Sequence, residues 1–311
     1  MSNPPFQTRA IERIPGGSPL PAHLRGAVIA LGNFDGFHRG HQAVVAHAVE
    51  MARARGVAAI VATFDPHPVR HFRADALPFR LSTLDQRQRL FAGAGVDAMM
   101  VFEFNGALAG VTPEEFVCRW LDGAGGVVTG DRFTFGRNRA GNVDVLAKLA
   151  HAQGLAYTAV KAIHEEGEIA SSSGVRAALK SGDCVAAARI LSRPFTIEGI
   201  LRGDEATDAA LPLHVANLGL GDFLRPRSGV YAVRGKLADG RILGGSAYLA
   251  GSPDASLRLF LVDLAKNDIG QHIDIQLIAH LHDAQQVYDR PALRQRIVLD
   301  RSEGRKIVFG G

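Results

Sequence analysis

Two histidines, His38 and His41, stand three residues apart in the run GNFDGFHRGH at residues 32–41. The run opens with a glycine-bearing turn and follows a short apolar segment, 27–31, that predicts a buried parallel strand. From about His41 the pattern predicts a helix, whose N-terminal N–H groups and partial positive charge favour an anion. Because two imidazoles there can donate hydrogen bonds to phosphate oxygens, the spacing predicts a phosphate site for nucleotidyl transfer rather than hydrolysis.

There are two alternatives for this histidine pair. Both histidines are metal ligands, or one of them is a buried side chain whose hydrogen bonds are made within the protein core. A structural zinc site needs further ligands, usually in a tetrahedral set. The only two cysteines, Cys118 and Cys184, each stand alone in segments that look helical. The dinucleotide fingerprint G-x-G-x-x-G is also absent from this run. The phosphate interpretation is therefore favoured.

A second motif, TFDPHP at residues 63–68, closes the next predicted strand. In open α/β sheets, ligands gather at the carboxyl ends of the strands, which makes this loop a candidate for a binding surface. Pro66 and Pro68 stiffen the loop around His67, and a rigid turn without further function is an equally good interpretation of this motif alone.

The remaining two motifs combine hydrogen-bond donors with turn and helix signals. The run GDRFTFGRNRAGN at residues 130–142 offers two phenylalanines to a flat ring and three arginines to phosphates, although a solvated basic loop would look the same. The run SSSGVR at 171–176 stands just before a predicted helix at 175–180. Its hydroxyls and the fork of Arg176 fit phosphate oxygens, whereas a simple helix cap needs only one serine.

The elements that position these motifs alternate along the first two thirds of the chain. Strands are predicted at 27–31, 58–64, 98–104 and 126–129, and helices at 42–55, 85–94, 113–121 and 142–151. This alternation predicts a parallel sheet with helices on both faces. Beyond Pro194, short runs at 197–201, 229–234, 243–249, 257–264 and 273–278 predict an antiparallel sheet or small barrel, followed by a helix at 290–301. The domain boundary is expected between residues 193 and 203.

Composition narrows the class of protein. The 311 residues are 47% hydrophobic and 21% charged, as in an ordinary globular protein. No apolar run is long enough to span a membrane, and no signal-peptide core is visible near the N-terminus. A net charge of +4 fits anionic small substrates but does not indicate a nucleic-acid partner. Two cysteines indicate no disulfide framework, so a reducing cytoplasm is expected.

Taken in order and with their spacing, the four motifs resemble the flavin adenine dinucleotide synthetase family of the prokaryotic riboflavin kinase/FMN adenylyltransferase type. The resemblance covers nearly the whole chain. It implies an α/β fold with a Rossmann-like nucleotidyltransferase domain over residues 1–195, followed by a riboflavin kinase-like antiparallel β-barrel over 196–311. It also implies that the chain takes ATP with Mg²⁺ and joins its adenylyl group to FMN, giving FAD and pyrophosphate. No motif assigns the metal ligands, and the oligomeric state is left open.

The resemblance also implies roles for individual residues. His38 and His41 would contact the triphosphate and stabilise charge on the transferred phosphate. The ATP pocket would be formed by Gly32, Asn33, Phe34, Asp35 and Gly40, with the β- and γ-phosphates held by Ser171, Ser172 and Arg176. The flavin side would be lined by Pro66, Pro68, Arg132, Phe133 and Phe135. Arg132 departs from the family, which commonly has Asp or Asn there, and Ser173 stands where the family usually has Thr.

The C-terminal part resembles the riboflavin kinase module but departs from its working residues. The stretch LPLHVAN at 211–217 aligns with the Pro-Thr-Ala-Asn motif of the kinase, with Val215 in place of the threonine. Arg258 stands where the family has its catalytic glutamate, and a permanent cation cannot accept a proton. The sequence therefore predicts that riboflavin kinase activity is lost. The alternatives are a nucleotidyltransferase for another phosphorylated small-molecule acceptor and a non-catalytic flavin or nucleotide sensor.

Overall fold

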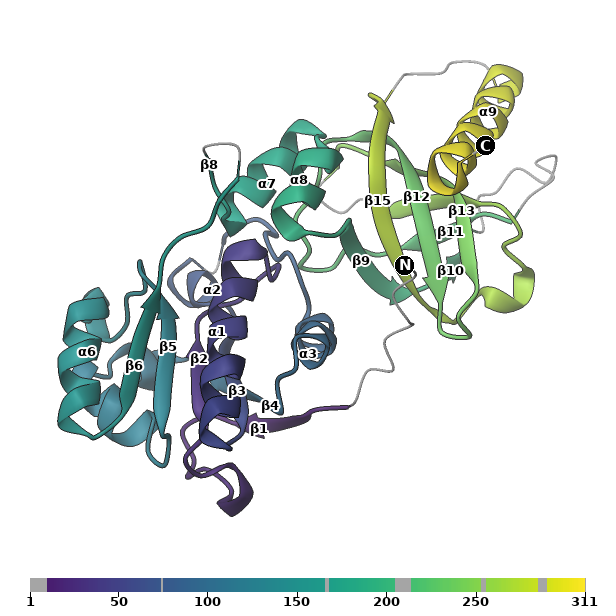
Figure 1. Ribbon diagram of the computed structural model, residues 1–311. Helices are drawn as coiled ribbons and strands as arrows, with labels where there is room; N and C mark the ends of the chain where they lie inside the picture. The colour runs from purple at the N-terminus through teal and green to yellow at the C-terminus, as the bar shows by residue number, and fades with distance from the viewer. Residues whose placement is uncertain are drawn as a thin grey trace. The chain divides into compact units, whose positions relative to one another are not determined.

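The computed structural model describes residues 10–73, 75–165, 168–204, 214–252, 256–284 and 290–310. The chain forms two compact units (Figure 1): Met1–Ala76 with Thr83–Ser171, and Leu77–Ser82 with Ser172–Gly311. The domain division predicted from the sequence, at residue 195, differs from this division into compact units and stays a prediction. It differs from the division into compact units because the helices after Ser171 contribute Val175, Leu179 and Cys184 to the hydrophobic core of the second unit.

The first unit is built on a six-stranded parallel sheet in the order β1-β4-β3-β2-β5-β6. Its strands are β1 (Glu12–Pro15), β2 (Val28–Leu31), β3 (Ala59–Asp65), β4 (Ala98–Glu103), β5 (Gly126–Gly130) and β6 (Ala156–Val160). The four strands predicted from apolar runs are confirmed as β2 to β5. The sequence pattern missed β1 and β6, because β1 is short and mostly exposed and β6 has no fully buried residue.

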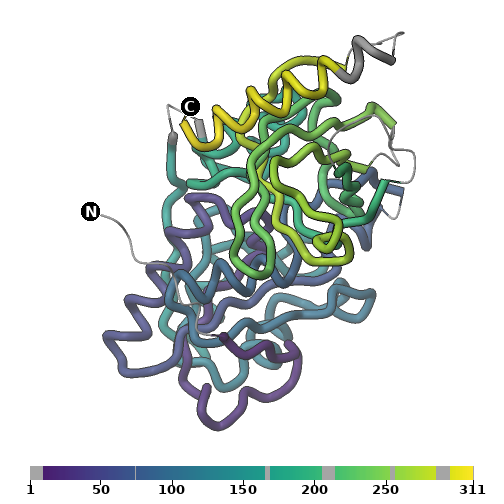
Figure 2. The backbone as a smooth tube through the Cα atoms, turned by 90° about the vertical axis from the view of Figure 1, so that its right-hand side faces the viewer, coloured from purple at the N-terminus to yellow at the C-terminus, as the bar shows by residue number. Residues whose placement is uncertain are grey.

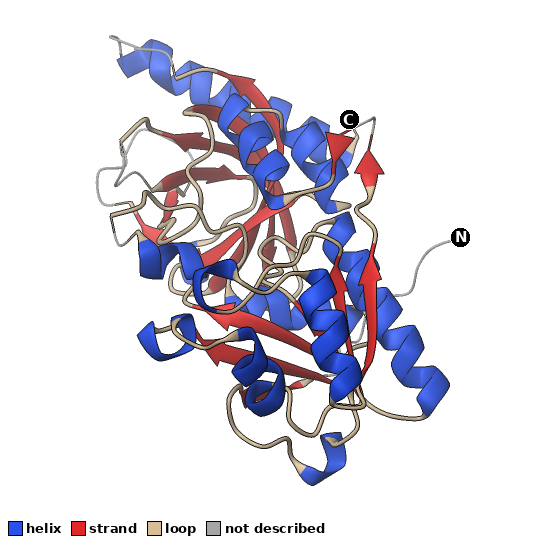
Figure 3. Cartoon of the chain, turned by 90° about the vertical axis from the view of Figure 1, so that its left-hand side faces the viewer, coloured by secondary structure: helices blue, strands red, loops and turns tan. Residues whose placement is uncertain are grey.

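Helices cover both faces of this sheet, as the blue helices beside the red strands show in Figure 3. Val28 and Ala30 of β2 pack into one hydrophobic layer, and Ile29 and Leu31 pack into the other. The longer helices are α1 (Arg39–Arg55), α3 (Leu84–Gly93) and α6 (Val143–Ala152), and the shorter ones are α2 (Pro68–Phe72), α4 (Gly106–Ala109) and α5 (Pro113–Glu115). The single helix predicted over 113–121 is instead two pieces, α5 and a π-helical turn at Phe116–Trp120. A short hairpin of β7 (His164–Glu165) and β8 (Glu168–Ile169) follows β6.

The strand order reverses between β2 and β5, because the chain moves outward from β2 to β3 and β4 and then returns to β5 on the other side. In open parallel sheets, the crevice for ligands lies at the carboxyl ends of the strands at this switch point. The loop that carries both histidines leaves β2 at that position.

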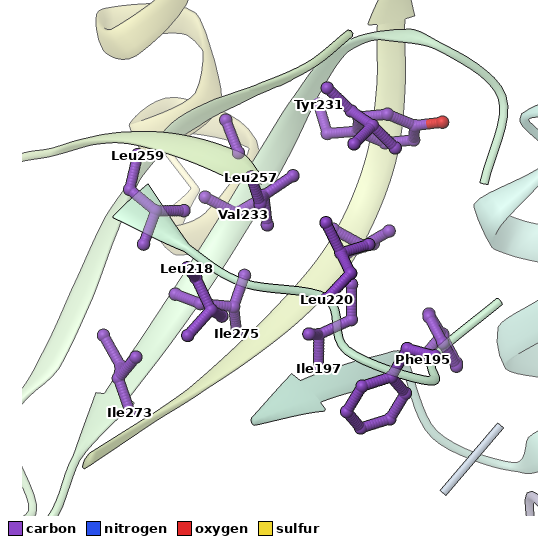
Figure 4. Close-up of a cluster of buried hydrophobic side chains, with 14 of the residues drawn as sticks. Phe195, Ile197, Leu218, Leu220, Tyr231, Val233, Leu257, Leu259, Ile273 and Ile275 are labelled. Carbon is purple, nitrogen blue, oxygen red and sulfur yellow. The ribbon is translucent and has the colours of Figure 1, made fainter. Parts of the chain in front are cut away.

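The second unit holds a seven-stranded antiparallel sheet in the order β10-β11-β14-β13-β12-β15-β9. Its elements are α7 (Ser172–Ser181), α8 (Cys184–Leu191), β9 (Phe195–Ile200), β10 (Arg202–Gly203), β11 (Ala216–Leu218), β12 (Gly229–Leu237), β13 (Ile242–Leu249), β14 (Leu257–Leu261), β15 (His272–His282) and α9 (Arg290–Phe309). Alternate residues of these strands, among them Ile197, Leu218 and Val233, point into one apolar core (Figure 4). The predicted barrel-like architecture is confirmed.

The C-terminal helix α9, yellow in Figure 2, packs against β12 and β13. It ends at Phe309, eight residues beyond the predicted end at 301. A Cβ added at Gly304 would lie 2.1 Å from the carbonyl oxygen of Gly245, so glycine lets the helix backbone touch the strand. Within the described residues, no helix is both long and apolar enough to cross a bilayer.

Candidate active site

The loop after β2 ends at His38, and His41 lies in the first turn of α1; residues 32–41 are called the histidine loop below. His38 caps this helix: the backbone N–H of His41 donates to Nδ1 of His38 over 3.4 Å. The two imidazole rings are stacked, with centroids 3.6 Å apart and an angle of 24° between their planes. The helix predicted from about His41 therefore begins at Arg39. Because Nδ1 of His38 accepts a hydrogen bond, neutral His38 carries its proton on Nε2, which is then a donor.

This loop is held in an unusual backbone conformation. Phe34 and Phe37 have φ values of 49° and 46°, a region that bulky residues seldom adopt. Both rings meet the ring of Phe91 on α3 edge-on, at centroid distances of 5.9 Å and 5.1 Å. Phe34 also meets His41 edge-on at 5.2 Å, and Asp35 is only 3% exposed. Such strain persists only where packing over-determines it, and it concentrates at functional sites.

Gly40 leaves room for the His38 ring and for the backbone at Ala170 to lie close to the start of α1. A Cβ at this position would lie 3.1 Å from Cε1 of His38 and 3.2 Å from the carbonyl oxygen of Ala170. A Cβ at Gly32 would similarly lie 3.1 Å from the Phe34 ring. The chain at Ala170 therefore runs beside the histidines, and Ser171 is the next residue.

A buried arginine beneath the loop was not predicted from the sequence. Arg87 on α3 is 3% exposed. Its Nη1 donates to the carbonyl oxygen of Asn33 (3.1 Å) and to Oγ1 of Thr63 (2.7 Å), and its Nη2 lies 3.6 Å from a carboxylate oxygen of Asp65. Thr63 Oγ1 in turn donates to the Asn33 carbonyl over 2.8 Å. The end of β3 and the start of the histidine loop are thus joined through one side chain.

The loop after β3 is short and carries an exposed aromatic surface. The Asp65–Pro66 peptide is cis, Pro66 is exposed and Pro68 is half-buried at the start of α2. Phe72 at the end of α2 is 68% exposed and meets the Phe104 ring edge-on at 5.8 Å. Neither Phe72 nor Phe104 was among the site residues predicted from the sequence. The signal that could have identified Phe72 is an aromatic residue four positions after Pro68.

The loop after β5 places Phe133 and Phe135 together, with ring centroids 5.7 Å apart and 14° between the planes. Phe135 is only 7% exposed, packs on Phe116 and pairs through its backbone with Gly141, whereas Phe133 is half-buried. The arginines of this loop are all exposed: Arg132, Arg137 and Arg139.

The serine motif differs in its local structure from the prediction. Helix α7 begins at Ser172, so Ser172 and Ser173 belong to its first turn instead of preceding it. Nε of Arg176 donates to the carbonyl oxygen of Phe79 over 2.9 Å, and its guanidinium lies over the Phe79 ring at 5.3 Å. Ser172 and Arg176 are part of the second unit. Their placement against the histidines stays a prediction.

Three of the four motifs thus lie on one edge of the parallel sheet. β2 lies between β3 and β5, and the histidine loop, the proline loop and the Phe133 loop follow the carboxyl ends of these three neighbouring strands. The histidine loop offers imidazole and helix N-terminal donors, which stabilise negative charge. The flanking loops offer aromatic rings, which can hold a flat ligand.

In the second unit, Arg258 forms an ion pair that involves a buried acid. Its Nε lies 2.5 Å from a carboxylate oxygen of Asp204, whose side chain is 6% exposed. On the neighbouring strands, Asn217 of β11 and Tyr248 of β13 are its register partners. Val215 is 6% exposed. Three residues of the stretch that resembles the kinase motif lie outside the described residues: Leu211, Pro212 and Leu213.

Comparison with known proteins agrees with this two-part architecture. A family model described as FAD synthetase matches residues 20–174, and one described as riboflavin kinase matches residues 191–308. A Pseudomonas fluorescens protein named bifunctional riboflavin kinase/FMN adenylyltransferase is 34% identical over 93% of this chain and 94% of its own length. The chain belongs to the bifunctional riboflavin kinase/FMN adenylyltransferase family.

A further relative supports the family relationship, and a solved structure shares the fold. The Escherichia coli K12 member of the family is 31% identical over 93% of this chain and 95% of its own length. A solved structure titled macrolide-efflux protein from Streptococcus pneumoniae shares the fold, with a TM-score of 0.84 over 95% of this chain and 99% of its own, at 21% identity. The family assignment thus covers both units, and the chain is a transferase of the nucleotidyltransferase type.

Proposed function

We propose that the protein is an FMN adenylyltransferase that transfers the adenylyl group of Mg-ATP to FMN. The observation that carries this proposal is the stacked pair of His38 and His41 at the N-terminus of α1, at the switch point of the sheet. The relatives named for this activity align over both units.

The reaction needs charge neutralisation more than a base. An oxygen of the FMN phosphate attacks the α-phosphorus of ATP, the bond from that phosphorus to the bridging oxygen of the β-phosphate breaks, and pyrophosphate leaves with the electron pair. The attacking oxygen is already anionic, so no proton has to be removed. His38 Nε2–H, the His41 ring and the helix N-terminus would stabilise the charge that builds on the transferred group and the leaving pyrophosphate.

The remaining residues divide into two sides. Gly32, Asn33, Phe34, Asp35 and Gly40 shape the ATP side together with Ser171, and Ser172 and Arg176 would hold the outer phosphates. Pro66, Pro68, Phe133 and Arg132 would line the flavin side, with Phe135 packed behind Phe133. We add Phe72, because an aromatic ring that is 68% exposed beside the proline loop is suited to a flat heterocycle. Magnesium would arrive on the triphosphate and be held mainly by phosphate oxygens.

We further propose that the second unit does not phosphorylate riboflavin. Arg258 is a permanent cation that forms an ion pair with the nearly buried Asp204, and a permanent cation cannot accept the proton of the riboflavin hydroxyl. Val215 is buried, and its side chain carries no oxygen that could bind a metal. The relatives are named as bifunctional, so this loss of activity would set the chain apart from these relatives.

An HPLC assay with Mg-ATP, offering FMN and riboflavin separately, tests both proposals. We expect FAD from FMN and no FMN from riboflavin. FMN from riboflavin would refute the second proposal alone. No product from FMN would refute the first and favour another phosphorylated acceptor or a sensor, which ligand binding without turnover would then separate.

A further inference from the structure

We propose that Arg87 is a positioning residue that aligns the ATP side of the site with the flavin side. This inference rests on the proposed adenylyl transfer and assigns a role to a residue that does not itself need to touch either substrate. Arg87 is buried, and its charge lies directly below two loops that follow neighbouring strands.

The contacts of Arg87 divide between these two loops. Towards the ATP side, it donates to the carbonyl oxygen of Asn33, which lies at the start of the histidine loop. Towards the flavin side, it donates to Thr63 Oγ1 and faces the Asp65 carboxylate, immediately before Pro66. A guanidinium can make these contacts at once because its donors form a rigid planar fork, whereas an ammonium is a single point of charge.

Helix α3 supplies a second connection to the same loop. Arg87 and Phe91 are one turn apart and therefore share a helix face. Phe91 packs on Phe34 and Phe37, so this face holds both the polar start of the histidine loop and its aromatic side chains. The helix itself is fixed at its start by a capping box between Thr83 and Gln86. The face is thus anchored rather than free to shift.

The expected consequence is specific to catalysis. Each substrate keeps its own contacts when Arg87 is changed, but the attacking phosphate and the α-phosphorus lose their mutual alignment. A misplacement of about 1 Å costs on the order of 100-fold in rate when the chemistry depends on in-line geometry. A residue that only stabilised the fold would lower the amount of active enzyme and would not change the turnover of the folded fraction.

The test compares Arg87→Lys with Arg89→Lys, a matched change at an exposed arginine of the same helix. FAD formation is measured at 10 °C, with the folded fraction of each sample determined by circular dichroism. For Arg87→Lys we expect kcat to fall about 100-fold, with the KM values for ATP and FMN within about threefold of the wild type. Arg89→Lys should match the wild type. Thr63→Val, which retains the charge of Arg87 but removes the shared hydroxyl, should lower kcat in the same direction if the lysine variant does not fold.

Three results would overturn the inference. One is a wild-type kcat in folded Arg87→Lys, or in Thr63→Val if the lysine variant does not fold, and another is a loss of activity that follows the folded fraction. The third is a rise in either KM with kcat unchanged, which would make Arg87 a binding residue. If the wild type and Arg89→Lys form no FAD, the adenylyl transfer itself is wrong, and the inference falls with it.

Discussion

Two arginines, Arg87 in the first unit and Arg258 in the second, differ in how they relate to positions that the sequence assigns to chemistry. Arg87 lies beneath the histidine loop and donates a hydrogen bond to the carbonyl oxygen of Asn33. Its guanidinium therefore holds the loop, and the two stacked imidazoles lie at the start of the helix. Arg258 instead lies in the row of residues that resembles a kinase site, and there it pairs with the nearly buried Asp204.

The difference shows that the same type of side chain can support a site or occupy one. In the first unit the donors that would meet phosphate are organised from below by Arg87 and Phe91. In the second unit a cation and an acid satisfy each other. A site that must stabilise charge during a reaction needs donors fixed before the substrate arrives, and only the first arrangement provides them. The predictions below test this contrast from its largest expected effect to its smallest.

His41→Ala should have the largest effect. Removing an imidazole from the position where charge develops is expected to lower kcat for FAD formation by about 10³-fold, as for the loss of an oxyanion donor. FMN binding, followed by quenching of flavin fluorescence, should change little. His151→Ala, at a histidine of α6, is a matched control and should leave kcat unchanged. Turnover that survives His41→Ala would mean that the first unit is not a catalytic site of this kind.

Gly40→Ala tests the close approach in the same loop. The added methyl group would lie 3.1 Å from the His38 ring and 3.2 Å from the Ala170 carbonyl, so one of them must move. We expect kcat to fall about tenfold through displacement of His38. Gly93→Ala in α3, where an added Cβ meets nothing within 4 Å, is the control and should behave as wild type. Equal kcat in the two variants would show that the positions of His38 and Ala170 do not matter for turnover.

The sequence could reveal the histidine loop because its signals are local. An apolar strand, glycines and two histidines fall within a few residues, and the structure places His38 one residue before α1. Arg87 could not be found this way, since its role depends on the register of β2 and β3 and on a helix more than 50 residues after Asn33. The contact of Arg176 with Phe79 likewise joins residues 97 positions apart. β6 was missed because its residues are half-exposed and show no clear alternation.

Arg258→Met tests the second half of the contrast. It removes the cation beside a carboxylate that is 6% exposed, while the Arg258 side chain is itself 39% exposed. Because water reaches part of this pair, we expect a loss of about 2 kcal/mol in the free energy of unfolding, below the range for fully buried pairs. The kcat for FAD formation at 10 °C should stay within about twofold of the wild type. Urea unfolding followed by circular dichroism measures the first quantity. A large fall in kcat would show that the sheet around Arg258 takes part in the transfer.

The pair of Asp268 and Arg241 should give the smallest effect, as a change of stability with pH. Asp268 is buried, and its hydrogen bonds with the Arg241 guanidinium hold its pKa below the ordinary value of 3.8. A carboxyl whose pKa is lower in the folded state stabilises the protein above its unfolded pKa, and this contribution is lost as the pH falls. We therefore expect the wild type to lose on the order of 1 kcal/mol more than Asp268→Asn between pH 5 and pH 3, as judged from urea unfolding. The asparagine variant has no carboxyl to protonate at this position, so the difference between the two curves isolates this one group. Parallel curves would mean that Arg241 does not favour the charged form of Asp268. The pairing of a buried acid with an arginine, as in Asp204 and Arg258, would then not be a general feature of the second unit.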